Sequence, residues 1–178
     1  MRKLASLLIL STLFAILTGV NLASVRVAQN GPDAEEYEVY SALINERYTA
    51  SSIQQINIEG MSLAAYNKVP DTLKTLPHIS GKTVADFKTK NTEAVAFNDL
   101  FHVKVKHELL EKGVVRVIPA HGTTILALSR VGFNAKRDQA LVYVIENCGG
   151  RCGKNYFALV VKEDGEWKLK GVEIIVVK

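Results

Sequence analysis

The residues in this chain that are best placed to do chemistry together are the two cysteines of Cys148-Gly-Gly-Arg-Cys152. Three intervening residues, two of them glycine, permit a tight backbone excursion that brings two Cβ atoms within reach of a disulfide. The spacing differs from the Cys-x-x-Cys of thioredoxin-like sites, and no βαβ pattern precedes it. The pattern therefore favours a structural disulfide, and a redox-active pair is the alternative.

Three histidines offer further ligands or bases. His102, His107 and His121, together with the cysteines, would be enough to bind zinc, but their spacing matches no compact zinc motif and oxidation competes for the thiols. A Cys/His nucleophile is disfavoured because the second cysteine commits the first thiol. No serine lies in a Gly-x-Ser-x-Gly frame. We therefore predict no metal, no cofactor and no catalytic residue.

Arg130 is the one charged residue of the apolar, strand-like segment 124–133. Strand alternation with Leu128 would place it in solvent. Alternatively, it pairs with a carboxylate or an anionic ligand inside a cone-shaped pocket. Arg130, Gly149, Gly150 and Arg151 are the candidate ligand or partner surface.

The N-terminus has the form of a signal peptide. Arg2 and Lys3 precede an apolar run over residues 4–20, as in the charged and hydrophobic regions of an export signal. The run is short for an anchor, since a membrane span needs about 20 apolar residues. We expect a signal peptide over residues 1–24 and a single exported domain over 25–178, in the periplasm, the cell envelope or the medium. The membrane is then a partner only through an uncleaved signal segment.

The net charge excludes one class of partner. Removal of Arg2 and Lys3 with the signal lowers the net charge from +4 to +2, and nucleic-acid binders concentrate basic charge on one face or tract. The basic cluster at 82–90 has helical spacing and is typical of a solvated helix face. We expect no nucleic-acid partner. The partner is otherwise unknown, and a protein or a cell-envelope component is the candidate.

A first helix is predicted after Asn30-Gly-Pro. Asp33 with Glu36 three residues later has the form of a capping box. Apolar and aromatic residues then recur at three and four positions, which predicts an amphipathic helix that ends near Tyr48. They are Tyr37, Tyr40, Leu43, Ile44 and Tyr48.

The pattern after this helix is weaker. Ile56 and Ile58 alternate in a possible edge strand. Ser80 or Thr83 can cap a second helix, which we expect to continue past a break near Asn91 as far as Phe101. Residues 102–118 alternate like a strand at first and then resemble a helix.

From Thr124 onwards four apolar, β-branched segments follow one another with turn residues between them, and Asp164-Gly165 predicts a tight hairpin. The segments cover residues 124–133, 139–147, 156–163 and 166–177. Short connections between consecutive antiparallel strands imply a meander. The predicted fold is α+β, with N-terminal helices (about 32–101) packed on a C-terminal antiparallel meander of about four strands (about 124–177).

The segment at 139–147 carries a further prediction. Leu141, Tyr143 and Ile145 should share one face of the strand, and Ala140, Val142 and Val144 the other. Both sets are apolar or aromatic, so we expect a central strand that is covered on both sides.

Four motifs occur in order: SRVGFN at 129–134, QALVYV at 139–144, CGGRCG at 148–153 and DGEWKLK at 164–170. They resemble the SRVGFN…ALVYV…CGG-x-CG…DGxW core of a family of uncharacterised exported bacterial proteins. The resemblance covers about the last third of the chain. It implies export and an α+β fold, but no reaction. Many members carry an aromatic-rich segment before this core, where this chain has VVRVIPAHG.

Three functions are compatible with these patterns. We favour an exported, non-catalytic binding or structural module that uses the sheet and the Gly-rich loop as a platform. The alternative is a small-molecule pocket protein or enzyme of the nuclear-transport-factor-like cone type, by analogy of fold alone. A thiol-disulfide redox protein is a lesser alternative. A filled core favours the first function, and a deep pocket lined by Tyr, Phe and Arg130 favours the second.

Overall fold

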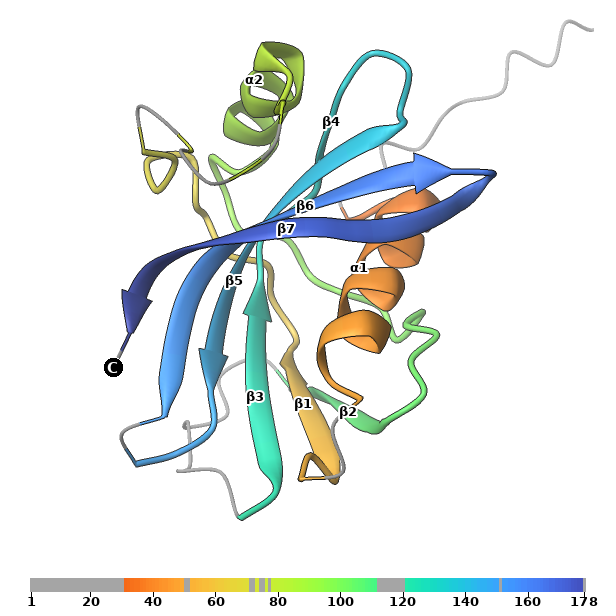
Figure 1. Cartoon of the computed structure of the whole chain (residues 1–178). Coiled ribbons are helices and arrows are strands. Elements are labelled where there is room, and N and C mark those ends of the chain that lie inside the picture. The colour runs from red at the N-terminus through yellow and green to blue at the C-terminus, as the bar shows by residue number, and fades with distance from the viewer. Residues whose placement is uncertain are drawn as a thin grey trace, which may run out of the picture.

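The computed structural model describes residues 31–49, 52–70, 73, 76, 78–111, 121–150 and 152–177. The predicted signal peptide and Arg151 lie outside these residues. Within them the chain forms two helices and seven strands (Figure 1). In chain order these are α1 (Ala34–Arg47), β1 (Gln55–Glu59), α2 (Gly81–Lys90), β2 (Lys106–Leu110), β3 (Thr123–Leu128), β4 (Gly132–Phe133), β5 (Gln139–Asn147), β6 (Gly153–Glu163) and β7 (Glu166–Val177).

The strands form one mixed sheet in the order β2-β1-β3-β5-β6-β7, and β4 pairs with the start of β5. β3, β5, β6 and β7 are antiparallel neighbours, which confirms the meander. The expectation of about four strands was too low, because β1 joins β3 and β2 joins β1, both in parallel. Parallel neighbours need long connections, and the chain between β1 and β3 contains α2 and β2.

The predicted hairpin at Asp164-Gly165 is present. Glu163 pairs with Glu166 across a two-residue turn, and Asp164 and Gly165 have φ angles of 52° and 86°. Two positive φ angles are the property of the turn that matches the twist of a hairpin.

The predicted strand over 124–133 is interrupted after Leu128. Ser129 Oγ accepts a hydrogen bond from the Tyr143 N–H at 2.9 Å, and the Arg130 N–H donates to Asn91 Oδ1 at 2.7 Å. The N–H groups of Tyr143 and Arg130 thus bond to side chains and not to the backbone of a paired strand. The chain therefore leaves the sheet after Leu128 and pairs with β5 again as β4.

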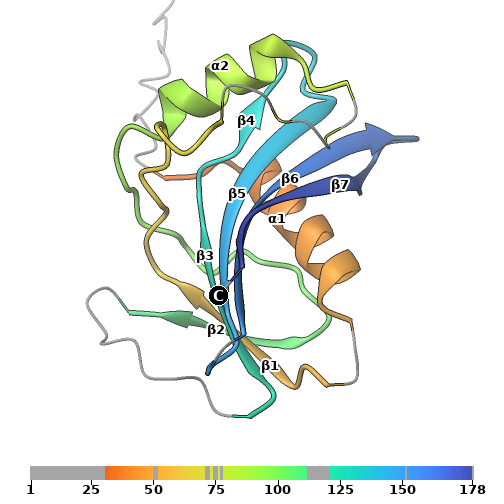
Figure 2. The same cartoon turned by 60° about the vertical axis from the view of Figure 1, so that its left-hand side comes forward.

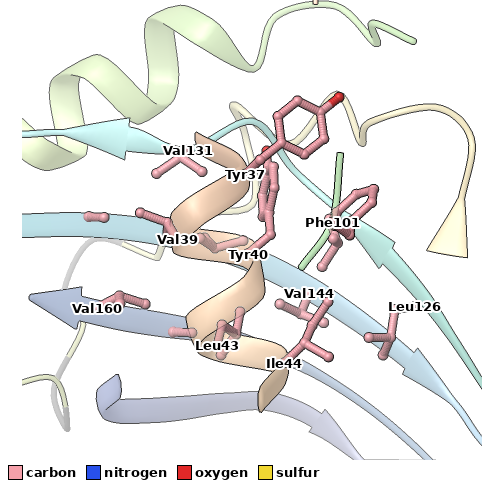
Figure 3. Close-up of a cluster of buried hydrophobic side chains, with 14 of the residues drawn as sticks. Tyr37, Val39, Tyr40, Leu43, Ile44, Phe101, Leu126, Val131, Val144 and Val160 are labelled. Atoms are coloured by element: carbon pink, nitrogen blue, oxygen red, sulfur yellow. The ribbon is translucent and has the colours of Figure 1, made fainter. Parts of the chain in front are cut away.

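α1 lies across the concave side of the bent sheet (Figure 2). Asp33 and Glu36 form the predicted capping box, and the predicted face of the helix is buried in the larger of two core clusters. Figure 3 shows Leu43 and Ile44 packed between α1 and the strands that carry Val144 and Val160. Each such buried side chain contributes roughly 1.5–3 kcal/mol.

The second helix is shorter than predicted. α2 is capped by Ser80 and ends at Asn91, and residues 92–101 are not helical. Asn91 ends the helix because its side-chain amide donates to the carbonyls of Phe87 and Arg130 and so links α2 to the interruption after β3. The predicted helical part over 32–101 therefore also contains β1 and, among the described residues, turns and other non-helical segments. Neither described helix has the length and apolar character to cross a membrane.

α2 covers the opposite side of the sheet (Figure 2). Leu141, Tyr143 and Ile145 pack there with Phe87 of the helix. Ala140, Val142 and Val144 belong to the cluster beneath α1. β5 is thus covered on both faces, as predicted.

Candidate functional site

Arg130 forms a buried ion pair with Glu36. Its Nη2 atom lies 2.5 Å from Glu36 Oε1, and its Nε atom lies 3.0 Å from Oε2. Glu36 is fully buried and the Arg130 side chain is 16% exposed. The paired carboxylate raises the pKa of the Arg130 guanidinium above its ordinary value. The sequence left two interpretations of Arg130, exposure to solvent or pairing with a carboxylate or an anionic ligand. In the structure Arg130 pairs with a carboxylate.

The backbone brings Glu36 to this position. As the third residue of α1 it closes the capping box with Asp33, and its Oε2 atom also accepts the Val131 N–H at 2.9 Å. The Tyr40 hydroxyl, one turn later, donates to the Ser129 carbonyl at 2.8 Å. The first two turns of α1 are therefore hydrogen-bonded to Ser129, Arg130 and Val131, the three residues between β3 and β4.

A second, more exposed layer of charge surrounds this pair. Arg137 bonds to Asp33 and Glu35, and Lys162 lies 2.9 Å from Glu35. Arg137 also stacks on Phe133, with its Cζ atom 4.0 Å from the ring centroid. Burial alone would raise the pKa of Asp33, but the Glu36 N–H and Arg137 outweigh it and lower that pKa. The cations of this region are thus already engaged with carboxylates of the same chain.

The two cysteines lie at disulfide distance, with Cα atoms 5.2 Å apart. Gly149 and Gly150 have φ angles of 85° and 56°, values that glycine adopts without steric cost. The Cys152 N–H donates to the Gly149 carbonyl at 2.9 Å, and the Asn147 side chain accepts the Gly149 N–H at 3.1 Å. The loop between β5 and β6 is therefore ordered by its own hydrogen bonds as well as by the cysteine pair.

Replacing Cys148 and Cys152 by serine together should lower the melting temperature by only several degrees, because a short closed loop stabilises by about 1–2 kcal/mol. Replacing one alone should do more harm, since it leaves a free thiol. Calorimetry on the variants measures both effects. Thiol labelling under denaturing, non-reducing conditions tests the bond, and two labelled cysteines would refute it.

The candidate residues do not form one site. Ser129, which precedes Arg130, hydrogen-bonds to Tyr143 in the middle of β5, whereas the loop begins after Asn147. Four residues of an extended strand span roughly 13 Å. Arg130 therefore lies beside the middle of β5, and Gly149 and Gly150 lie beyond its end.

The histidines have other partners. His107 Nε2 lies 3.0 Å from Asp99 Oδ1, the His102 backbone bonds to Ser41 and Asn45, and His121 is exposed in a turn. Among the described residues no three His, Cys, Asp or Glu side chains gather closely enough to hold a metal ion.

A buried polar cluster that the sequence analysis missed lies at the other end of α1. The hydroxyls of Tyr48 and Tyr156 are 2.7 Å apart, and Tyr48 also donates to Glu146 at 3.0 Å. The Arg47 guanidinium lies over the Tyr156 ring, 4.3 Å from its centroid. Burial raises the pKa of Tyr156 to about 12. Both tyrosines look like core residues in the sequence pattern, which gives no signal for the contact between their hydroxyls.

Arg130 lines neither of two surface hollows that described residues form. One, of ≈ 250 Å³, lies between the end of α1 and the segment before β2, beside Tyr48, Asn45 and Lys104. The other, of ≈ 380 Å³, lies between α2 and the turn before β5, beside Lys82 and Arg137.

Comparison with protein-family models, with curated proteins and with solved structures finds no match to this chain. The resemblance to exported bacterial proteins with the SRVGFN core therefore stays a prediction.

Proposed function

We propose that this chain is an exported, non-catalytic module that binds a protein or another component of the cell envelope. The observation that carries this proposal is that packed side chains cover both faces of the sheet. α1 and α2 cover the concave and convex sides with packed side chains, and Glu36 neutralises Arg130. Neither the buried charge nor the core is then open to a substrate.

The loop between β5 and β6 is the recognition element in this proposal. Asn147 and Gly150 are exposed, and the internal hydrogen bonds of the loop fix its shape before a partner binds, which reduces the entropy lost on binding. Arg151 and Lys154 add positive charge to this part of the sequence, so an acidic partner surface fits it best. A cysteine pair at disulfide distance is in keeping with an oxidising compartment.

Co-sedimentation of the purified chain with washed cell envelopes tests this function. We expect the wild-type chain to sediment with the envelopes, and Arg151→Glu to lose most of the bound fraction because it reverses the charge of the loop. Lys136→Glu is the matched control, since Lys136 is an exposed cation in the turn at the opposite end of β5. Equal retention of the two variants, or no retention of the wild type, would contradict the proposal.

A second candidate, the small-molecule pocket of the nuclear-transport-factor-like cone type, is favoured by the hollow beside Tyr48. This hollow is lined by Ile44, Ile53 and Val105, with Lys104 also on its wall, a composition that suits a small aliphatic or aromatic acid. Ligand-detected NMR with hexanoate and benzoate tests it. Saturable binding that Lys104→Glu abolishes would support the pocket, and the module that we favour predicts none.

The lesser alternative, a thiol-disulfide redox protein, makes a different prediction. Mild reduction would then abolish a measurable thiol-exchange activity while the fold survives. A structural cysteine pair gives no such activity in an insulin-reduction assay.

A further inference from the structure

The hollow between α2 and the turn before β5 has a positively charged wall. Its volume of ≈ 380 Å³ lies in the range of small-molecule sites. Lys82 and Lys90 of α2 and Arg137 of the turn line it, and Asp86 is the one carboxylate among the described lining residues. Three cations against one carboxylate leave an excess of two positive charges. A concave surface with an excess of one sign attracts ligands of the other.

The other lining groups hold two of these cations in place. Asp86 Oδ2 lies 3.1 Å from Lys90 Nζ and accepts the Phe133 N–H at 2.7 Å. The Phe133 ring lies beneath Arg137 and Lys90, with its centroid 4.0 Å from Arg137 Cζ and 4.9 Å from Lys90 Nζ. Both cations are therefore positioned before a ligand arrives, which reduces the entropy lost on binding.

Each of the three cations retains hydrogen-bond donors. The Lys90 ammonium has three, of which two are directed to Asp86 and to the Val131 carbonyl at 3.2 Å. Arg137 bonds to its carboxylates through Nε and Nη2, and its Nη1 group donates to no described residue. Lys82 is exposed and forms no ion pair with a described residue. Donors of three side chains are thus left for a ligand.

We propose that this hollow binds a phosphomonoester group through Lys82, Lys90 and Arg137. A phosphomonoester has a charge of about −1.5 to −2 at pH 7 and three strong acceptor oxygens. It therefore matches both the excess charge of the wall and its three donor side chains, whereas a carboxylate has one charge and two oxygens. Arginine and lysine are also the side chains that recognise phosphate in proteins.

Lys82 lies where a cation does not stabilise its own helix. The N-terminal end of a helix favours negative charge, and α1 has Glu35 and Glu36 in its first turn. The first turn of α2 has no acidic residue and contains Lys82. A phosphate bound beside Lys82 would supply the negative charge that this end of α2 lacks.

Titration of the amide NMR signals with glycerol phosphate, at an ionic strength held constant with sodium chloride, tests the site. We expect saturable shifts in α2 and in the turn before β5. Lys82→Gln should weaken binding about tenfold, the effect of losing one charge-assisted hydrogen bond. Lys88→Gln is the matched control, since Lys88 is an exposed lysine of the same helix that does not line the hollow. It should leave the affinity unchanged, and unchanged melting temperatures show that both variants fold.

Flotation with phosphatidylcholine vesicles, with and without phosphatidic acid, separates two sources of the phosphate. A response to glycerol phosphate shows that a soluble ester is sufficient, and flotation with phosphatidic acid alone identifies a lipid headgroup. In either case Lys82→Gln must weaken binding more than Lys88→Gln does. No response to either probe, or equal losses for the two variants, would overturn the proposal.

This inference goes beyond the proposed function and does not depend on it. The envelope test changes Arg151 in the loop after β5, whereas this test changes Lys82 on α2. Either proposal can therefore fail while the other stands.

Discussion

Replacing Glu36 by glutamine is expected to lower the free energy of unfolding by about 3–5 kcal/mol, the cost of breaking a buried ion pair by removing one partner. Glutamine has nearly the same shape and is accepted at the third position of a capping box. The change therefore removes the charge and little else. It leaves the Arg130 guanidinium, 16% exposed, without a carboxylate in a place that water hardly reaches. Urea denaturation followed by circular dichroism measures the loss.

Two further variants separate the ion pair from general damage to α1. Glu38→Gln is the matched control, because Glu38 lies on the same helix but is exposed, and it should change stability by less than about 0.5 kcal/mol. The joint change Glu36→Leu with Arg130→Met should be less destabilising than Glu36→Leu alone, since it leaves no unpaired charge. A loss below about 1 kcal/mol for Glu36→Gln would show that the pair contributes no more than a surface ion pair.

Gly132→Ala is expected to lower the free energy of unfolding by about 2–3 kcal/mol, the effect of overpacking a core contact. A Cβ atom on Gly132 would lie 2.5 Å from the Cα and backbone N of Phe87. The obstacle is the backbone of α2, which cannot rotate away as a flexible side chain would. The helix must therefore move off β4, and the packing of the Phe87 ring against Phe157 is disturbed with it.

Gly81→Ala is the control for this prediction. Gly81 is the first residue of α2, and a Cβ atom there would meet nothing within 4 Å. Alanine should leave stability unchanged or raise it by a few tenths of a kcal/mol, because it is the better helix former. Equal urea midpoints for the two variants would contradict the close contact between β4 and α2.

Local patterns were sufficient for the elements whose neighbours in the sequence determine them. The capping box at Asp33 set the start of α1, the alternation along 139–147 gave both faces of β5, and Asp164-Gly165 gave the hairpin. In the helix cap and the hairpin the partner groups lie within a few residues. The two faces of β5 follow from the two-residue period of a strand, which the sequence pattern records directly.

The features that periodicity missed depend on residues far apart in the sequence. Strand alternation with Leu128 would place Arg130 in solvent, but the strand ends before it and its partner Glu36 is 94 residues away. Glu36 was recognised only as part of a helix cap. In the same way, nothing near Asn91 shows that its amide binds the Arg130 backbone and ends α2. The parallel pairing of β1 likewise joins Gln55 to Thr123, across a segment with no clear pattern.

The long separation between α1 and its partners has a consequence for the order of folding. α1 leaves the ribosome early, but Val131, which its Glu36 binds, and Tyr156, which Tyr48 contacts, are synthesised about 100 residues later. The β5–β6 and β6–β7 hairpins involve short chain loops and can close quickly, whereas contacts of high sequence separation are slow to form. The apolar stripe of α1 should thus stay uncovered until the last strands are complete. During that interval the stripe is open to a holding chaperone.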